Sequence, residues 1–169
     1  MFLAVAMVPP VMAGEAGPQL KLLGTLEGGR PPVLANIAFS PDGKVLASSD
    51  YNDDDDASTV QLWDVDKRKA IATLGGRTYR VCSVAFSPDG KTLASGGKDK
   101  TVILWDVANR KPLREPLKGH QGEVTSVAFH PESKMLAAAS TGFVSRASRW
   151  VGTLIVWDVA TGKKQELDQ

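Results

Sequence analysis

The sequence predicts an all-β protein built from three copies of one repeating unit. The segment FSPDGKVLAS at residues 39–48 recurs as FSPDGKTLAS at residues 86–95, and a looser copy, FHPESKMLAA, spans residues 129–138. The phenylalanines that begin these segments are 47 and 43 residues apart (86 minus 39, 129 minus 86). Each segment is followed by an apolar unit that contains Trp-Asp-Val: VQLWDV at 60–65, VILWDV at 102–107 and LIVWDV at 154–159. Self-similarity at this period indicates a modular fold.

The residues around each repeated phenylalanine predict two strands joined by a turn. VCSVAFSP at 81–88 and VTSVAFHP at 124–131 are too short and too rich in β-branched residues for a helix. In the turn at residues 40–43, proline presets φ, aspartate binds nearby N–H groups and glycine accepts a positive φ. Second strands are expected to start near Leu46 and Leu93.

The rest of each repeat supplies two more strands. The Trp-Asp-Val units are the predicted third strands, and the stretches 70–74, 112–117 and 162–167 are the predicted fourth strands. Residues 20–26 read as one extra copy of a fourth strand, ahead of the first repeat. The expected total is thirteen short strands (three times four, plus one) and no helix.

Composition and charge exclude several classes of protein. With 169 residues, 43% of them hydrophobic and 23% charged, the chain has the balance of a soluble globular domain. Twenty basic and nineteen acidic residues give a net charge of +1, so no bulk field favours nucleic acid or an anionic membrane, and neither is expected as a partner. The apolar run at 1–12 is far shorter than the roughly 20 residues that span a bilayer, so no membrane insertion is expected.

Residues 1–17 are expected to be either a secretory signal peptide or a disordered tail. Small residues precede candidate cleavage points after Ala13 and Ala16, but no Lys or Arg occurs before Lys21, so the positive segment that begins a signal peptide is missing. A signal peptide would place the protein outside the cell or in a periplasm, whereas a tail leaves it in the cytoplasm.

Three Trp-Asp pairs at the same place in three repeats resemble the WD40 repeat family. The residues that carry the resemblance are the SPDGK turns, Gly119 with His120, and the pairs Trp63 and Asp64, Trp105 and Asp106, Trp157 and Asp158. The match covers residues 20–169, with repeats at about 20–67, 68–110 and 111–169, inside a repeat domain at 18–169. The resemblance implies four-stranded antiparallel blades that pack side by side as parts of a β-propeller.

The resemblance also implies a buried polar network of His, Ser or Thr, Asp and Trp in each blade. The second repeat has Ser95, Asp99 and Trp105 but no histidine, and the first has Ser48 with Trp63. The third has His120 and Trp157, but Ala138 stands at the serine position. No repeat has the full set, so apolar packing replaces the network or Arg30 and Arg77, at the histidine position, substitute as donors. A structural role is expected for His120.

Two repeats carry insertions between their second and third strands. The separation from Phe to Trp is 24, 19 and 28 residues in the three copies (63 minus 39, 105 minus 86, 157 minus 129). The resemblance places this loop on the face that the family uses to bind partners. One insertion, 51–56, is acidic, and the other, 142–150, is basic and aromatic. The candidate partner-binding residues are Phe143, Arg146, Arg149, Trp150, Asp53, Asp54, Asp55 and Asp56.

Each insertion also has a plainer interpretation. Trp150 could fold back onto its own blade, and the four aspartates could form a solvated hairpin tip. A calcium site is disfavoured because consecutive carboxylates point in different directions and the spaced ligands of calcium loops are missing.

The expected function is a non-catalytic scaffold that binds other proteins, with no cofactor and no metal. No nucleophile and base pair, phosphate-binding loop or metal-ligand cluster is evident in the sequence, and the resemblance implies interaction rather than catalysis. The alternatives are the scaffold portion of a larger propeller-containing enzyme or sensor, or a small-ligand site at the propeller axis. Closed propellers typically have about four to eight blades, so three repeats predict either further blades in a longer protein or self-association.

Overall fold

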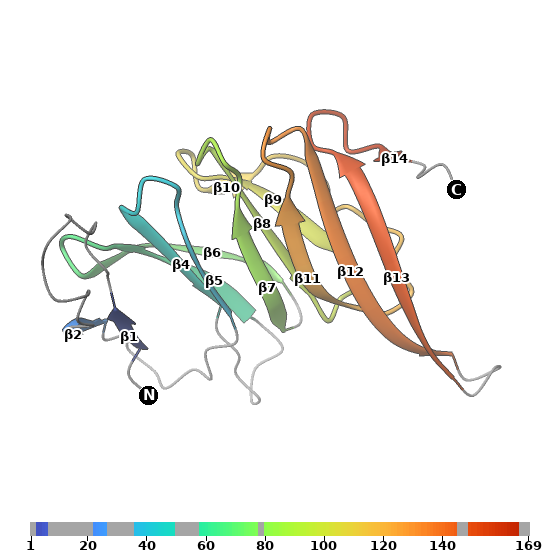
Figure 1. The fold of residues 1–169 in the computed structure, drawn as a ribbon, viewed down its shortest axis with the longest axis horizontal. Coiled ribbons are helices and arrows are strands. Elements are labelled where there is room, and N and C mark those ends of the chain that lie inside the picture. The colour runs from blue at the N-terminus through green and yellow to red at the C-terminus, as the bar shows by residue number, and fades with distance from the viewer. Residues whose placement is uncertain are drawn as a thin grey trace, which may run out of the picture.

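The computed structural model describes residues 3–6, 22–26, 36–49, 58–77, 80–144 and 149–165. Every regular element within these ranges is a β-strand, which confirms the all-β prediction (Figure 1). No helix in this part of the chain is long and apolar enough to cross a membrane. The described strands number fourteen, and twelve of them form three separate four-stranded sheets.

Each four-stranded sheet is one repeat, and its strands pair antiparallel in chain order. We call the three sheets blade 1, blade 2 and blade 3 in chain order. Blade 1 consists of β3 (Asn36–Phe39), β4 (Val45–Ser49), β5 (Ser58–Asp64) and β6 (Lys69–Arg77). Blade 2 consists of β7 (Val81–Phe86), β8 (Thr92–Gly97), β9 (Val102–Asp106) and β10 (Lys111–Pro112). Blade 3 consists of β11 (Glu123–Phe129), β12 (Met135–Val144), β13 (Arg149–Asp158) and β14 (Lys164–Gln165).

The extra strand ahead of the repeats is present but has a partner. Strand β2 (Leu22–Leu26) pairs antiparallel with β1 (Leu3–Ala6), so that Leu3 lies opposite Leu26. The sequence of residues 1–17 predicts no strand, because a short apolar run fits a signal peptide as well as a strand. A single strand leaves its backbone donors and acceptors unpaired at both edges, and β1 pairs with one of those edges. The rest of the segment 1–17 lies outside the described residues.

The turns between first and second strands have the predicted chemistry. The Ser40 hydroxyl donates to Asp42 Oδ1 at 2.6 Å, and Ser87 makes the same bond to Asp89 at 2.6 Å. Gly43 and Gly90 have φ values of 71° and 70°, the left-handed region that glycine adopts without a steric penalty. Local side chains therefore set both turns.

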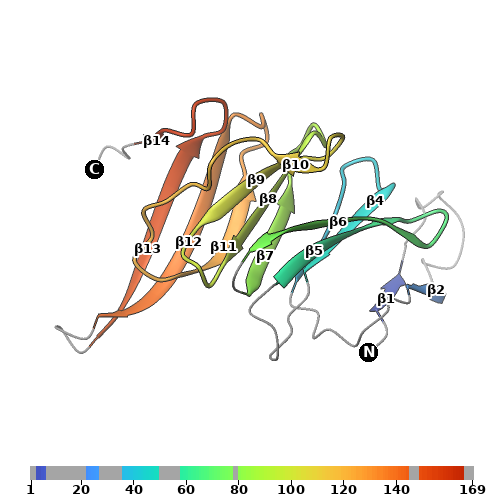
Figure 2. The ribbon, with the colours of Figure 1, turned by 180° about the vertical axis from the view of Figure 1, so that it is seen from behind.

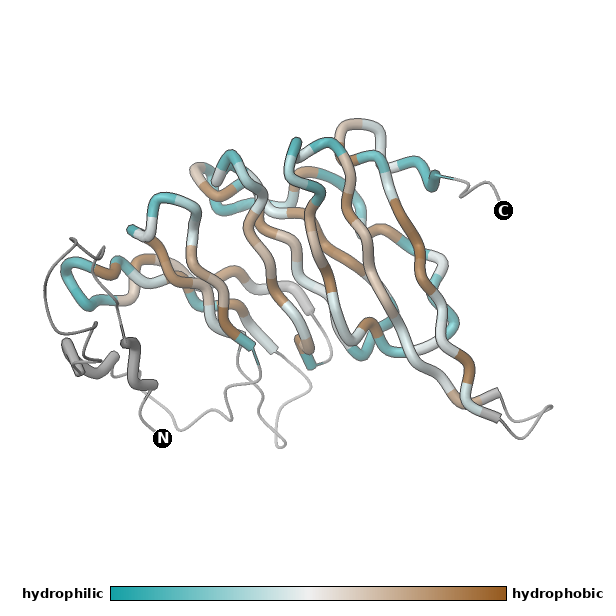
Figure 3. The backbone as a smooth tube through the Cα atoms, viewed as in Figure 1, coloured by the Kyte–Doolittle hydropathy of each residue, from teal (hydrophilic) through white to brown (hydrophobic). Residues whose placement is uncertain are grey.

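Apolar side chains from neighbouring blades pack together in buried clusters. The hydrophobic stretches of the described chain lie mostly on the inner strands of the blades, and the connecting turns are mostly hydrophilic (Figure 3). The buried cluster between blades 1 and 2 contains Ala47, Val60, Leu62, Leu74, Val81, Val84, Leu93, Ile103 and Trp105. The cluster between blades 2 and 3 contains Ala94, Val102, Leu104, Leu117, Val124, Val127, Leu136, Ala138 and Trp157. Successive side chains in a strand point to opposite faces, so blade 2 contributes to both clusters.

A hydrogen bond accompanies the apolar packing at each of these contacts. The Val84 N–H of blade 2 donates to Asn36 Oδ1 of blade 1 at 3.0 Å. The Val127 N–H of blade 3 donates to Ser83 Oγ of blade 2 at 3.2 Å. Asn36 and Ser83 occupy the same position, three residues before the repeated phenylalanine. The blades therefore contact each other in the same way twice.

The three blades stand in an open row, with blades 1 and 3 at opposite ends (Figures 1 and 2). The row does not close on itself, as the number of repeats predicted.

The close contact at Gly96 predicts a packing defect on substitution. A Cβ at Gly96 would lie 2.5 Å from Val124 Cγ1 and 3.0 Å from Val127 Cγ1, which are buried in the contact between blades 2 and 3. We expect Gly96→Ala to lower the free energy of unfolding by about 1–3 kcal/mol, because overpacking a filled core costs this much. Urea unfolding followed by circular dichroism measures it.

Gly75→Ala is the matched control. No atom lies within 4 Å of a Cβ built at Gly75, and we expect its unfolding midpoint to stay at or slightly above that of the parent chain. Equal midpoints for Gly96→Ala and the parent would contradict the described packing.

Candidate functional site

Two of the three repeated tryptophans bind a serine in their own blade. Trp63 Nε1–H donates to Ser48 Oγ at 2.8 Å, and Trp105 Nε1–H donates to Ser95 Oγ at 2.8 Å. Both serines are buried, so the bond satisfies an indole donor that water cannot reach. These bonds are the part of the predicted network that the first two blades contain.

The third blade uses a different serine. Position 138 is alanine, but His120 Nδ1 lies 2.7 Å from Ser140 Oγ. The prediction that this repeat lacks a serine in the network is wrong, because Ser140 lies two residues further along β12 and therefore on the same face as Ala138. The His120 ring packs edge-on against Trp157 with ring centroids 5.3 Å apart.

The surroundings of His120 disfavour its protonated form. Its side chain is buried, and among the described residues its Nε2 has no hydrogen-bond partner. Burial, and secondarily the charge of Lys164, lower the pKa of His120 below its ordinary value of 6.5. A neutral ring packed on Trp157 fits the structural role that we expected. Arg30 lies outside the described residues, as does the side chain of Arg77.

The aspartates of the three Trp-Asp pairs organise turns. Asp64 accepts the Lys67 N–H, Asp106 accepts the Asn109 N–H and Asp158 accepts the Thr161 N–H, at 2.8, 2.8 and 2.7 Å. The Lys67 and Asn109 N–H bonds lower the pKa of Asp64 and Asp106. At Asp158 the bond from the Thr161 hydroxyl, also at 2.7 Å, is the main cause of the lowered pKa, and the Thr161 N–H adds to it.

Asp99 plays a similar local part in the turn between β8 and β9. Its Oδ1 accepts from the Thr101 N–H at 3.0 Å and from the Thr101 hydroxyl at 2.9 Å. In the part of the chain that the structure describes, no group of three or more His, Cys, Asp or Glu side chains is arranged to hold a metal ion.

The insertion in the third repeat forms a β-hairpin extension. Strands β12 and β13 pair from Met135 and Asp158 out to Val144 and Arg149, and they project beyond the ends of the neighbouring strands (Figure 1). The prediction of a lengthened loop is therefore wrong for residues 142–144 and 149–150, which are strand. The inserted residues continue the backbone ladder of β12 and β13 past the point at which blade 2 makes its compact turn.

Phe143 and Trp150 form a cross-strand pair on this hairpin. Phe143 is 54% exposed and Trp150 is 73% exposed, so Trp150 does not fold back into the blade core. Their rings meet edge-on with centroids 5.6 Å apart. Aromatic pairs of this kind hold each other in place and leave apolar surface available.

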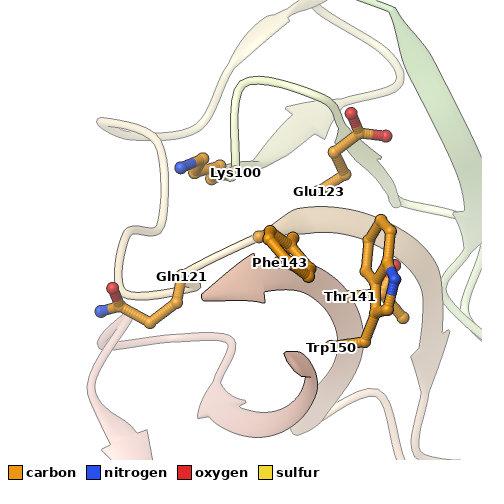
Figure 4. Close-up of a pocket in the computed structure, with 8 residues that line it drawn as sticks. Lys100, Gln121, Glu123, Thr141, Phe143 and Trp150 are labelled. Carbon is orange, nitrogen blue, oxygen red and sulfur yellow. The ribbon is translucent and has the colours of Figure 1, made fainter. Parts of the chain in front are cut away.

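An open hollow of ≈ 360 Å³ adjoins this pair (Figure 4). Besides the two aromatic rings, the hollow is lined by Lys100 from blade 2 and by Gln121, Glu123 and Thr141 from blade 3. Gly122 and Gly142 also line it, and a Cβ at Gly122 would lie 2.1 Å from the Thr141 carbonyl oxygen, so the two backbones approach closely there. The hollow thus combines two exposed rings with a polar rim.

The other candidate residues are only partly located. Arg149 begins β13, but its side chain lies outside the described part of the structure. Arg146 and the four aspartates Asp53, Asp54, Asp55 and Asp56 also lie outside it. The segment that contains the aspartates connects β4 to β5, as 145–148 connects β12 to β13, so the two insertions leave their blades at equivalent ends.

Comparison with known families identifies the repeats. The WD40 family profile, described as WD domain, G-beta repeat, matches residues 20–64, 68–106 and 110–145. Periodic tryptophan protein 2 homolog of Schizosaccharomyces pombe is 34% identical over 131 residues. That alignment covers 78% of this chain but 14% of the relative, so this chain corresponds to a small part of it.

Solved structures share the fold at low sequence identity. The WD40 repeats of RRP9 and the structure of U3-55K both superpose with a TM-score of 0.67 at 21% identity, covering 82% of this chain and 39% and 40% of theirs. Hydrazine synthase of Kuenenia stuttgartiensis superposes with a TM-score of 0.68 at 20% identity, over 86% of this chain and 38% of that one.

The Trp105 to Ser95 bond gives a stability prediction. Ser95→Ala leaves a buried indole N–H without this acceptor, and we expect it to lower the free energy of unfolding by about 1–3 kcal/mol. A double-mutant cycle with Trp105→Phe separates this bond from the other interactions of Ser95. If Ser95→Ala costs the same in the Trp105→Phe background, the bond contributes nothing.

The lowered pKa of His120 predicts a pH dependence of stability. The His120 side chain takes up a proton near pH 6.5 in the unfolded chain and at lower pH in the folded chain. The contribution of this residue to the free energy of unfolding is therefore fully present above pH 6.5 and is lost as the pH falls below it. Between pH 7.5 and 5.5, we expect the free energy of unfolding, measured with urea, to fall less in His120→Gln than in the parent chain. It should also fall less in Lys164→Gln than in the parent. Parallel pH profiles for all three proteins would exclude this role.

Proposed function

This chain belongs to the WD40 repeat family, and from that membership we propose that it is a non-catalytic scaffold that binds a protein partner through the projecting hairpin of blade 3. The observation that carries the proposal is the exposed Phe143 and Trp150 pair. Aromatic side chains and arginine are the residue types enriched where a few residues supply most of the binding energy.

The hairpin is suited to binding because its shape is set before a partner arrives. Its backbone is paired along both strands, and the two rings contact each other. A preorganised surface loses little conformational freedom on association, so more of the contact energy appears as affinity. Phe143 and Trp150 would serve as the anchors of the interface.

The polar surroundings indicate what the partner surface carries. Lys100 and Glu123 line the hollow beside the rings, and Arg146 and Arg149 add two positive charges to the hairpin in the sequence. A partner segment with an apolar side chain between acidic residues fits this set. A separate acidic contact is offered by the segment that connects β4 to β5, which contains Asp53, Asp54, Asp55 and Asp56. This segment occupies the same place in blade 1 as the hairpin tip does in blade 3.

Capture experiments with the purified chain test this function. We expect Trp150→Ala and Phe143→Ala each to reduce capture of the partner from a lysate of the source cells by tenfold or more, because losing an anchor costs at least about 2 kcal/mol. Arg149→Ala should reduce it less. Quantitative mass spectrometry of the captured proteins measures the loss.

Leu113→Ala is the control, because Leu113 is also a large exposed apolar residue (46%) but lies outside the hairpin. Circular dichroism confirms that each variant is folded. Capture that is equal for the parent, Trp150→Ala and Phe143→Ala would rule out the hairpin as the binding surface.

A second candidate function is the scaffold portion of a larger enzyme or sensor. The fold similarity to a chain of hydrazine synthase supports it, since propeller blades then occur within an enzyme. Sequencing the reading frame on both sides of this segment distinguishes the two, because a catalytic domain in frame would favour the second candidate.

A further inference from the structure

The outer face of blade 3, which points away from blade 2, has the composition of a blade contact. Leu136, Ala138 and Trp157 point toward blade 2, so the alternate residues of β12 and β13 point the other way. Within the part of blade 3 that matches blade 2, the residues pointing away are Ala137, Ala139, Leu154 and Val156. The equivalent residues of blade 2 are Ala94, Gly96, Val102 and Leu104. Three of these, Ala94, Val102 and Leu104, belong to the buried cluster between blades 2 and 3.

One repeat position shows that no other blade of the described residues covers this face. The residue three before the Trp of Trp-Asp is 1% exposed in blade 1 (Val60) and 0% exposed in blade 2 (Val102). In blade 3 the same position is Leu154, which is 59% exposed. The residue at this position is apolar in all three repeats, and what differs is whether another blade of the described chain packs on it.

The outer face of blade 1 shows the complementary deficit. The residue two before the repeated phenylalanine is 4% exposed in blade 2 (Val84) and 6% exposed in blade 3 (Val127), where each packs on the preceding blade. In blade 1 it is Ile37, which is 44% exposed. Phe39 beside it is 40% exposed, whereas Phe86 and Phe129 are partly buried against their clusters.

The hydrogen bond that joins neighbouring blades has an equivalent acceptor on blade 3 and an equivalent donor on blade 1. Asn36 and Ser83 each accept an N–H from the next blade. The equivalent residue of blade 3 is Ser126, which is exposed. The N–H that corresponds to those of Val84 and Val127 belongs to Ile37.

We propose that two copies of this chain associate head to tail, the outer face of blade 3 in one copy packing on the outer face of blade 1 in the other. Leu154 then packs among Ile37 and Phe39 of the second copy, and Ser126 accepts its Ile37 N–H. Two identical contacts close a ring of six blades (two times three), within the range of about four to eight blades found in closed propellers. The contact repeats an interface that the chain already contains twice.

The close approach at this interface is sterically compatible with the residues present. The position that is Gly96 in blade 2 is Ser49 in blade 1, where the serine is 0% exposed against blade 2. In blade 3 it is Ala139, which is smaller than the serine that the first contact accommodates. The outer face of blade 3 therefore has room for another blade.

This association is independent of the proposed partner binding. Beyond the pair of Ala139 and Leu154, which matches the last aligned pair of blade 2, the hairpin continues for five cross-strand pairs, Ser140 with Thr153 to Val144 with Arg149. Phe143 and Trp150 lie in that extension, about 13 Å along the strand at roughly 3.4 Å per residue, past the area that a neighbouring blade covers. They stay accessible in a ring.

Sedimentation velocity of the purified chain tests the association. We expect a mass of 36.0 kDa, twice 18.0 kDa, at micromolar concentration. Leu154→Asp and Ile37→Asp should each shift the protein to the monomer mass, because each places a charge in both contacts of the ring. Leu113→Asp, at an exposed leucine outside both faces, should remain a dimer.

Mixing the two monomeric variants gives a result that a head-to-tail contact alone predicts. In an equimolar mixture the unsubstituted face of each variant can meet that of the other, so a dimer should reappear. A dimer in Ile37→Asp alone would indicate that blade 3 faces pair with each other, and it would overturn the head-to-tail arrangement.

Ser126→Ala provides a second measurement that does not disturb folding. Its side chain is exposed in the single chain. Its loss should raise the dimer dissociation constant about ten- to a hundredfold, because the ring contains two such contacts and therefore loses two hydrogen bonds. A monomer for the unsubstituted chain would overturn the proposal and assign both faces to blades of a longer polypeptide.

Discussion

The packing of one blade on the next is the interaction on which the rest of this structure depends. Each blade is a sheet with apolar residues on both faces, and neighbouring positions of one strand serve different contacts: Trp105 packs toward blade 1, and Leu104 packs toward blade 3. Such a sheet cannot bury its apolar area alone, so its stability comes from its neighbours. The repeated contact explains both the regular spacing of the sequence and the uncovered apolar faces at the two ends of the row.

Polar groups adapt to this packing and differ from blade to blade. Trp63 and Trp105 donate to serines, whereas blade 3 places His120 between Ser140 and Trp157. The variation is tolerated because a single hydrogen bond contributes about 1 kcal/mol, while the apolar positions of the contact are kept. The aspartates after each tryptophan act within their own turns, and this explains how they recur unchanged while the buried network does not.

The surface proposed for partner binding lies where the repeat pattern ends. Past the pair of Ala139 and Leu154 the hairpin of blade 3 has no counterpart in blade 2, and the outer part of this extension carries the exposed side chains of Phe143 and Trp150. Backbone pairing keeps the extension ordered, and the contact of Phe143 with Trp150 holds the two rings in place. One blade thus provides a contact for another blade and, beyond it, a surface for a different protein.

Local patterns in the sequence were enough to predict the repeats, the strand order within each blade and the turns, because turn residues act on their own backbone and strand alternation is a local pattern. The sequence also placed Phe143 and Trp150 among the candidate partner-binding residues, but it assigned them to a loop and left open whether Trp150 folds back onto its own blade. The three-dimensional arrangement was needed to find that Leu3–Ala6 pairs with β2, that Ser140 bonds His120 where position 138 is alanine, and that Leu154 and Ile37 are exposed in the described structure. Each of these depends on which distant residue lies alongside, and a residue's exposure depends on whether another blade is packed against it.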